Sequence, residues 1–185
     1  MFGNLVTNRQ LRQLIKANEI QIDPFVDESL KTTHYTLRPG RVLGRQADGS
    51  WKQVHNFKDD DHEYAIQENG YVVVEVREAV RIASEGIVGR FIPTSNLIEA
   101  GLDLVAGQID NKYGLKGEGL RFGLKNLLPV RNVIGAEMRL AHVEFFDLRG
   151  ITPDPVKLSD EERAIRLRRM IKAMDDGIDY EQKAP

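Results

Sequence analysis

Short runs of apolar and β-branched residues recur along the first 150 positions, and glycines or polar stretches separate them. Residues 71–76 (YVVVEV) form the strongest run, because valine and tyrosine favour extended backbone. Many short strands between glycine turns predict a sandwich or barrel rather than βαβ units. We expect further strands at residues 20–25, 35–38, 86–92, 102–109, 120–124 and 138–146.

Two polar stretches interrupt this pattern and predict turns or loops. Pro39 and Gly40 together are typical of a turn after the run at residues 35–38. Residues 46–64 are polar, with an acidic cluster at residues 59–61 before His62, and they predict a loop or an excursion between strands. We interpret the acidic cluster as solvated rather than metal-binding, because adjacent loop residues point in different directions.

The two ends of the chain show helical periodicity instead. Thr7 and Gln10 have the spacing of a capping box, and Leu11, Leu14 and Ile15 then form one apolar stripe. After a proline-rich break at residues 152–155, an amphipathic pattern predicts a second helix whose apolar face holds Leu167, Met170, Ile171 and Met174. We therefore divide the chain into a β domain at residues 1–150 and a linker with a helix at residues 151–185.

Composition narrows the classes of protein. The 185 residues include 26 basic and 28 acidic side chains, so the formal net charge of -2 gives no reason to expect a nucleic-acid partner. No apolar run approaches the roughly 18 residues that span a bilayer, and we expect no membrane partner. The chain has no cysteine, which excludes disulfides and thiolate metal sites. We expect a cytoplasmic protein.

Three stretches, in this order, resemble the dCTP deaminase/dUTPase superfamily over residues 5–148. The first is IQIDPF at residues 20–25 with HYTLRPG at residues 34–40. The second is PTSNL at residues 93–97, followed by GLDLVAGQIDNKY at residues 101–113. The third is MRLAHVEFF at residues 138–146. Each motif is weak alone, and their order makes the resemblance specific for the fold.

The resemblance implies a mainly β fold, a distorted jelly-roll β-barrel that assembles as a homotrimer with nucleotide sites at subunit boundaries. It implies that Asp110 activates the attacking water and that Tyr113 packs under a deoxyribose. Ser95 matches the serine of the phosphate-binding motif, with Asn96 and His142 at neighbouring substrate-binding positions. Magnesium would enter with the phosphates of a deoxynucleoside triphosphate.

Several positions depart from the family pattern. Thr94 replaces an arginine, Asn96 a glycine and His142 a glutamine, and Thr36 replaces the first motif's carboxylate. If Asn126 is aligned with the family's asparagine, Gly123 occupies the position of the deaminase's catalytic glutamate. Loss of that carboxylate weighs against deamination, whereas Asp110 keeps pyrophosphate hydrolysis open.

The candidate residues also have structural interpretations. Asp110 suits a turn aspartate bonded to its own backbone, and His142 suits a core or interface histidine. Residues 114–119 form a glycine-rich insertion that reads as a hairpin, with a lid or a partner contact as alternatives. The C-terminal helix suits docking on the barrel or on a protein partner.

Two functions remain open at this level. The first is a divergent dCTP deaminase/dUTPase-like enzyme that processes a deoxynucleoside triphosphate. The second is a non-catalytic trimeric structural or regulatory module, such as a phage particle component or a nucleotide sensor. Occupancy of the pocket that contains Asp110 distinguishes them, because the structural module predicts a filled or collapsed pocket.

Overall fold

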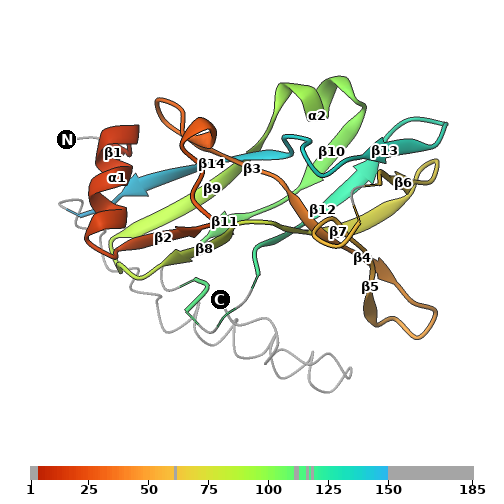
Figure 1. Ribbon diagram of the computed structural model, residues 1–185, viewed down its shortest axis with the longest axis horizontal. Coiled ribbons are helices and arrows are strands. Elements are labelled where there is room, and N and C mark those ends of the chain that lie inside the picture. The colour runs from red at the N-terminus through yellow and green to blue at the C-terminus, as the bar shows by residue number, and fades with distance from the viewer. Residues whose placement is uncertain (1–3, 61, 111–112, 116, 118, 150–185) are drawn as a thin grey trace, which may run out of the picture. The chain divides into compact units, whose positions relative to one another are not determined.

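The computed structural model describes residues 4–60, 62–110, 113–115, 117 and 119–149. Residues up to Arg149 belong to one compact unit, and most of its regular structure is β-strand (Figure 1). The predicted C-terminal helix lies outside the described residues. None of the described helices is long and apolar enough to cross a membrane.

Five strands form the first sheet, in the order β1-β14-β9-β11, with β3 also paired to β14. Every pairing is antiparallel, and β14 is the central strand because β1, β3 and β9 all bond to it. The strand bounds are β1 Asn4–Leu5, β3 Tyr35–Leu37, β9 Ile87–Pro93, β11 Gln108–Ile109 and β14 Ala141–Asp147.

The second sheet also has five strands, in the order β10-β12-β7-β4-β5. Its central strand β7 is the valine-rich run, whose side chains alternate between the core and the outer face. The bounds are β4 Pro39–Arg45, β5 Trp51–Asn56, β7 Tyr71–Val76, β10 Leu102–Val105 and β12 Arg121–Asn126.

Smaller elements complete the unit. Two two-stranded sheets pair β13 with β6 and β2 with β8. Helix α1 begins after Thr7, whose capping box with Gln10 is formed as predicted, and Leu11 and Leu14 are buried. The bounds are α1 Asn8–Lys16, β2 Ile20–Asp23, the 3-10 helix η1 Asp27–Ser29, β6 Tyr64–Ile66, β8 Ala79–Ile82, α2 Ser95–Glu99 and β13 Asn132–Ile134.

A single apolar cluster joins the sheets and α1. Fully buried side chains from both large sheets meet in it, which removes apolar surface from water and stabilises the unit. Its largest members include Tyr35, Ile66, Ile82, Leu97, Leu124 and Phe145. The mainly β class is therefore confirmed, although the described sheets do not close into a barrel.

The turn predicted at Pro39 and Gly40 was wrong, and the polar stretch at residues 46–64 is an excursion that contains a strand. Pro39 and Gly40 begin β4 instead of forming a turn, and a Cβ at Gly40 would lie 2.9 Å from the backbone nitrogen of Arg77. Residues 46–64 contain β5, which pairs with β4 around a turn at Gly49 (φ 84°) and extends away from the other strands (Figure 1). Most of β5 is exposed at the edge of the sheet. Its sequence is therefore polar, and for that reason no strand was predicted there.

Candidate functional site

Three of the motifs that carry the resemblance lie together around β14. His142 pairs with Thr36 on one side of the strand and with Ile92 on the other. The backbone N–H of Leu140 donates to Leu37 O (3.1 Å), and that of Thr94 donates to Leu140 O (3.3 Å). The sheet register therefore brings together residues that are distant in sequence.

Thr94 is buried and caps a helix that the sequence pattern did not predict. Its hydroxyl donates to Arg139 O at 2.6 Å and accepts the N–H of Leu97 at 3.2 Å, so it fixes the start of α2. The family's arginine position is thus used for internal hydrogen bonding. Ser95 and Asn96 follow it in the first turn of α2, and both are exposed to solvent.

His142 is half-buried and lies in a small polar cluster. Its Nδ1 is 3.1 Å from the hydroxyl of Thr36, and its ring centroid is 3.9 Å from that of His34. Burial, the neighbouring His34 and Arg139 lower the pKa of His142 to about 4. The imidazole is therefore neutral at pH 7, and its Nδ1 is bonded within the protein.

Asp110 and Tyr113 lie at the end of β11, away from regular structure. Asp110 is exposed, and its Oδ1 accepts a hydrogen bond from the side-chain amide of Gln108 at 3.2 Å. Tyr113 is half-buried, and its hydroxyl donates to Gly119 O at 3.2 Å. The backbone N–H of Tyr113 donates to Asp110 O at 3.3 Å, so a turn joins the two residues.

The position expected for a deaminase's glutamate is covered by an aromatic ring. Gly123 is buried in β12, and a Cβ built on it would lie 2.1 Å from the hydroxyl oxygen of Tyr71 and 2.6 Å from its Cζ. Real Cβ atoms essentially never approach other atoms within 3.0 Å. Any side chain at position 123 therefore requires Tyr71 to move.

Tyr71 is the residue that motif comparison missed. It pairs with Lys125 across β7 and β12, while Gly123 pairs with Val73, so Tyr71 and Gly123 are diagonal neighbours. Aromatic side chains reach diagonal neighbours on a sheet face. The signal in the sequence was a tyrosine at the start of one predicted strand and a glycine inside another, but the register between them was unknown.

The family model that matches this chain is described as dCTP deaminase-like and covers residues 5–148. The chain belongs to the dCTP deaminase-like family. The resemblance read from the three motifs is thereby confirmed, and this family supports a role in nucleotide processing in general. No curated protein sequence matches the chain significantly.

Solved structures place this family member among dCTP deaminase and dUTPase folds. The Agrobacterium tumefaciens 2'-deoxycytidine 5'-triphosphate deaminase has a TM-score of 0.61 at 12% identity and covers 80% of this chain. The match takes in 49% of the deaminase chain, so this chain spans about half its length. At these identities the similarity shows the fold alone.

Two phage dUTPases are similar over most of their length. A dUTPase mutant from phage phi11 of S. aureus, described with a structural Mg(II) ion, has a TM-score of 0.51 at 14% identity, covering 76% of this chain and 96% of its own. A Staphylococcus bacteriophage 80alpha dUTPase mutant with dUpNHpp has a TM-score of 0.51 at 13% identity, with coverages of 77% and 92%.

Proposed function

We propose that this family member binds a deoxynucleoside triphosphate without deaminating it, and that it acts as a nucleotide sensor. The observation that carries this proposal is the ring of Tyr71 over Gly123. Deamination of a base needs a group that transfers protons at the reacting carbon. A glycine supplies no such group, and the phenol of Tyr71 fills the space next to it.

Nucleotide binding would use the residues that match the family motifs and remain accessible. Ser95 and Asn96 offer exposed polar groups for a phosphate, and Tyr113 offers an aromatic face for a deoxyribose. The loss of the motif's arginine removes one strong charge-assisted hydrogen bond. We therefore expect weak binding, about tenfold or more weaker than with that arginine present.

Hydrolysis of pyrophosphate from the triphosphate is the second candidate activity. It is favoured by Asp110, an exposed carboxylate that Gln108 helps to orient. An ionised carboxylate within reach of a water is the group that general-base hydrolysis requires. In this reaction Asp110 would accept the proton of the attacking water.

Magnesium fits this site only together with the nucleotide. The described residues contain no group of three or more His, Cys, Asp or Glu side chains that could hold a metal ion. Mg²⁺ is commonly held by one or two carboxylates plus substrate phosphates. Among the site residues, Asp110 supplies such a carboxylate. When bound, the ion would neutralise phosphate charge, and the site residues would orient the sugar and the water.

Calorimetric titration with dUTP, dCTP and dTTP, with magnesium present, tests the proposal. We expect binding that Ser95→Ala weakens and that Ser50→Ala, an exposed serine in the β4–β5 turn, leaves unchanged. Pyrophosphate released in parallel and abolished by Asp110→Asn would establish the hydrolase. No binding at millimolar nucleotide would contradict both candidates and leave a structural role, such as that of a trimeric phage particle component.

A further inference from the structure

A basic cleft of about 470 Å³ lies at one end of the outer face of the second sheet. Its cationic side chains are Arg41, Lys58, Arg77, Arg81 and Arg121, and its carboxylates are Glu75 and Glu78. Five cations and two carboxylates leave an excess of three positive charges in a chain whose net charge is -2. Gly40, the last residue of one family motif, lines this cleft, but none of the candidate site residues Ser95, Asn96, Asp110, Tyr113 and His142 does.

The floor of the basic cleft is a row of three side chains from adjacent strands. Arg41 on β4 and Arg121 on β12 both pair in register with Glu75 on β7. Arg121 Nε donates to Glu75 Oε2 at 2.8 Å, and Arg41 Nε donates to Glu75 Oε1 at 2.9 Å. One carboxylate therefore holds two guanidinium groups side by side.

Glu75 holds these two arginines in place through its buried carboxylate. Its side chain is only 10% exposed, whereas those of Arg41 and Arg121 are 42% and 52% exposed. Burial opposes its ionisation, but the hydrogen bonds from Arg121 and Arg41 outweigh burial and lower the pKa of Glu75. Each guanidinium has five N–H donors, so both arginines keep donors for a second anion.

The absence of a side chain at Gly119 leaves room for the carboxylate of Glu75. A Cβ at Gly119 would lie 2.3 Å from the Cδ of Glu75. Any larger residue at position 119 would displace the carboxylate that holds the two arginines. The floor of the cleft is therefore a packed arrangement, and its guanidinium groups are oriented before any ligand arrives.

The second carboxylate is also engaged by the protein. Glu78 is buried and its Oε2 accepts the backbone N–H of Arg38 at 3.0 Å. Burial raises the pKa of Glu78 despite the nearby Arg38 and Arg77. Arg77 in turn donates to Ala136 O at 2.7 Å and to Glu137 at 2.9 Å.

Two further cations that line the cleft have no such partner among the described residues. Within the described part of the chain, neither Lys58 nor Arg81 forms an ion pair or a side-chain hydrogen bond, and both are exposed. The basic cleft thus combines two guanidinium groups that Glu75 holds in place with two exposed cations, Lys58 and Arg81. This arrangement is complementary to a ligand with several negative charges close together.

We propose that the basic cleft binds a polyphosphate group, either inorganic or carried by a nucleotide, at a site that none of the candidate nucleotide-binding residues Ser95, Asn96, Tyr113 and His142 lines. Its volume exceeds the need of a single phosphate and falls within the range of small-molecule pockets. A cleft of this volume suits a compact ligand better than a nucleic-acid duplex, which needs an extended basic face. A di- or triphosphate carries charge that matches the excess of three cations.

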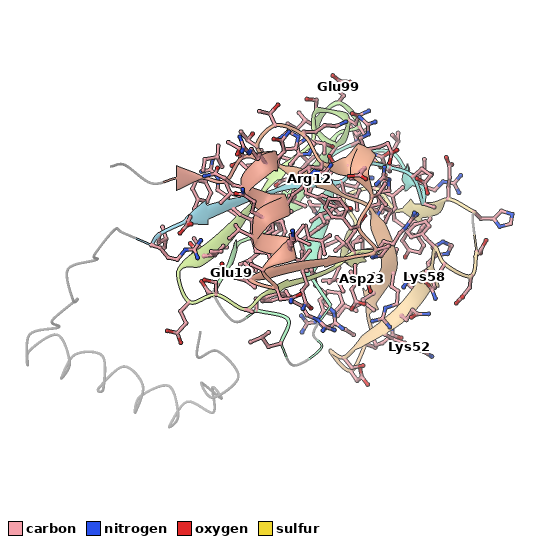
Figure 2. All side chains as sticks on the ribbon, turned by 60° about the vertical axis from the view of Figure 1, so that its left-hand side comes forward. Arg12, Glu19, Asp23, Lys52, Lys58 and Glu99 are labelled. Carbon is pink, nitrogen blue, oxygen red and sulfur yellow. The ribbon has the colours of Figure 1, made fainter. Side chains whose placement is uncertain are left out.

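Titration of the full chain with inorganic tripolyphosphate tests this proposal, because tripolyphosphate has no sugar or base. We expect binding at about 150 mM salt, weakened about tenfold by Lys58→Ala and similarly by Arg81→Ala. The matched control is Lys52→Ala, which removes the same charge from an exposed lysine of β5 on the same side of the molecule (Figure 2). That control should change the affinity less than twofold.

Three outcomes would overturn the proposal: no binding of tripolyphosphate, equal weakening by Lys52→Ala and Lys58→Ala, or tighter binding of a short DNA duplex than of tripolyphosphate. Parallel titration with dUTP identifies the source of the phosphate. Lys58→Ala weakens dUTP binding if the nucleotide uses the cleft, whereas Ser95→Ala weakens it if the nucleotide uses the family motifs. Unchanged thermal unfolding of the variants confirms that they are folded.

Discussion

The polar residues around β14 and those of the basic cleft are used in different ways. Around β14, the hydroxyl of Thr94 and the Nδ1 of His142 bond to other groups of the protein. In the cleft, Glu75 is the group committed to internal contacts, and the arginines it holds are about half exposed. Several of the family's motif positions lie in the first region, yet the second region offers more positive charge to an anionic ligand.

A position that matches a family motif can therefore keep its place in the fold while the side chain there takes a different role. Thr94 stands where the family has a phosphate-binding arginine, and it caps α2 instead. Gly123 is the position where the motif alignment expects a deaminase's glutamate, and Tyr71 covers it. The fold of the family is kept, whereas these two aligned positions hold a threonine and a glycine instead of an arginine and a glutamate.

Removing the hydroxyl of Thr94 should have the largest effect on stability. Thr94→Val keeps the shape of the side chain but removes the hydroxyl that donates to Arg139 O and accepts the N–H of Leu97, which keeps only its 3.1 Å hydrogen bond to Thr94 O. We expect the free energy of unfolding to fall by about 2 kcal/mol. Chemical denaturation of the wild type and the variant measures this change.

Ser95→Ala is the control for that prediction, because Ser95 is the exposed neighbour of Thr94. Surface substitutions of this kind change stability by no more than about 0.5 kcal/mol. Equal effects of the two substitutions would show that Thr94 is not the cap of α2, and the contrast drawn between the two regions would fail.

The cluster of His142 and His34 should make stability depend on pH. Burial lowers the pKa of both groups, in His142 from 6.5 to about 4, so folding favours the neutral imidazoles. This stability is fully present above about pH 6.5 and is lost as the pH falls towards 4. Charged groups that act on the pair are Glu144, Lys31 and Arg139.

His142→Gln should flatten that pH dependence, since glutamine does not titrate. After discounting for partial exposure to solvent, we expect the wild type to lose about 1–2 kcal/mol more than the variant between pH 7 and pH 4. Unfolding free energies measured across this range provide the comparison. Parallel curves for the two proteins would refute the assigned role of His142.

The contact between Tyr71 and Gly123 should give the smallest effect, and a double-mutant cycle isolates it. Gly123→Ala forces the exposed ring of Tyr71 to move, which we expect to cost about 1 kcal/mol. In the Tyr71→Ala background the same substitution should cost close to nothing. Additive effects of the two substitutions would mean that the ring does not occupy the space above Gly123.

The strands and α1 could be predicted because their signals are local. The run of valines marks β7, and the spacing of Thr7 and Gln10 marks the start of α1. Residues 102–109 form two strands, β10 and β11, in different sheets, although the sequence predicts one. Helix α2 was missed because its five residues are too few to show a helical period.

The candidate site could be predicted only in part, because its decisive contacts depend on register. The positions of Ser95, Asn96, Asp110, Tyr113 and His142 follow from the motifs. That Tyr71 covers Gly123, and that Glu75 bridges Arg41 and Arg121, follows from the pairing of β7 with β4 and β12. A one-residue shift in that pairing would place these side chains on the other face of the sheet.

The most direct test of the central claim is the release of ammonia from dCTP by the unmodified protein, with magnesium present and protein and nucleotide at comparable concentrations. If the ring of Tyr71 covers a glycine where deamination needs a carboxylate, no ammonia should appear above the rate in buffer. Ammonia release that increases in proportion to the protein concentration would contradict the account, because the deaminase reaction would then proceed without a side chain at Gly123.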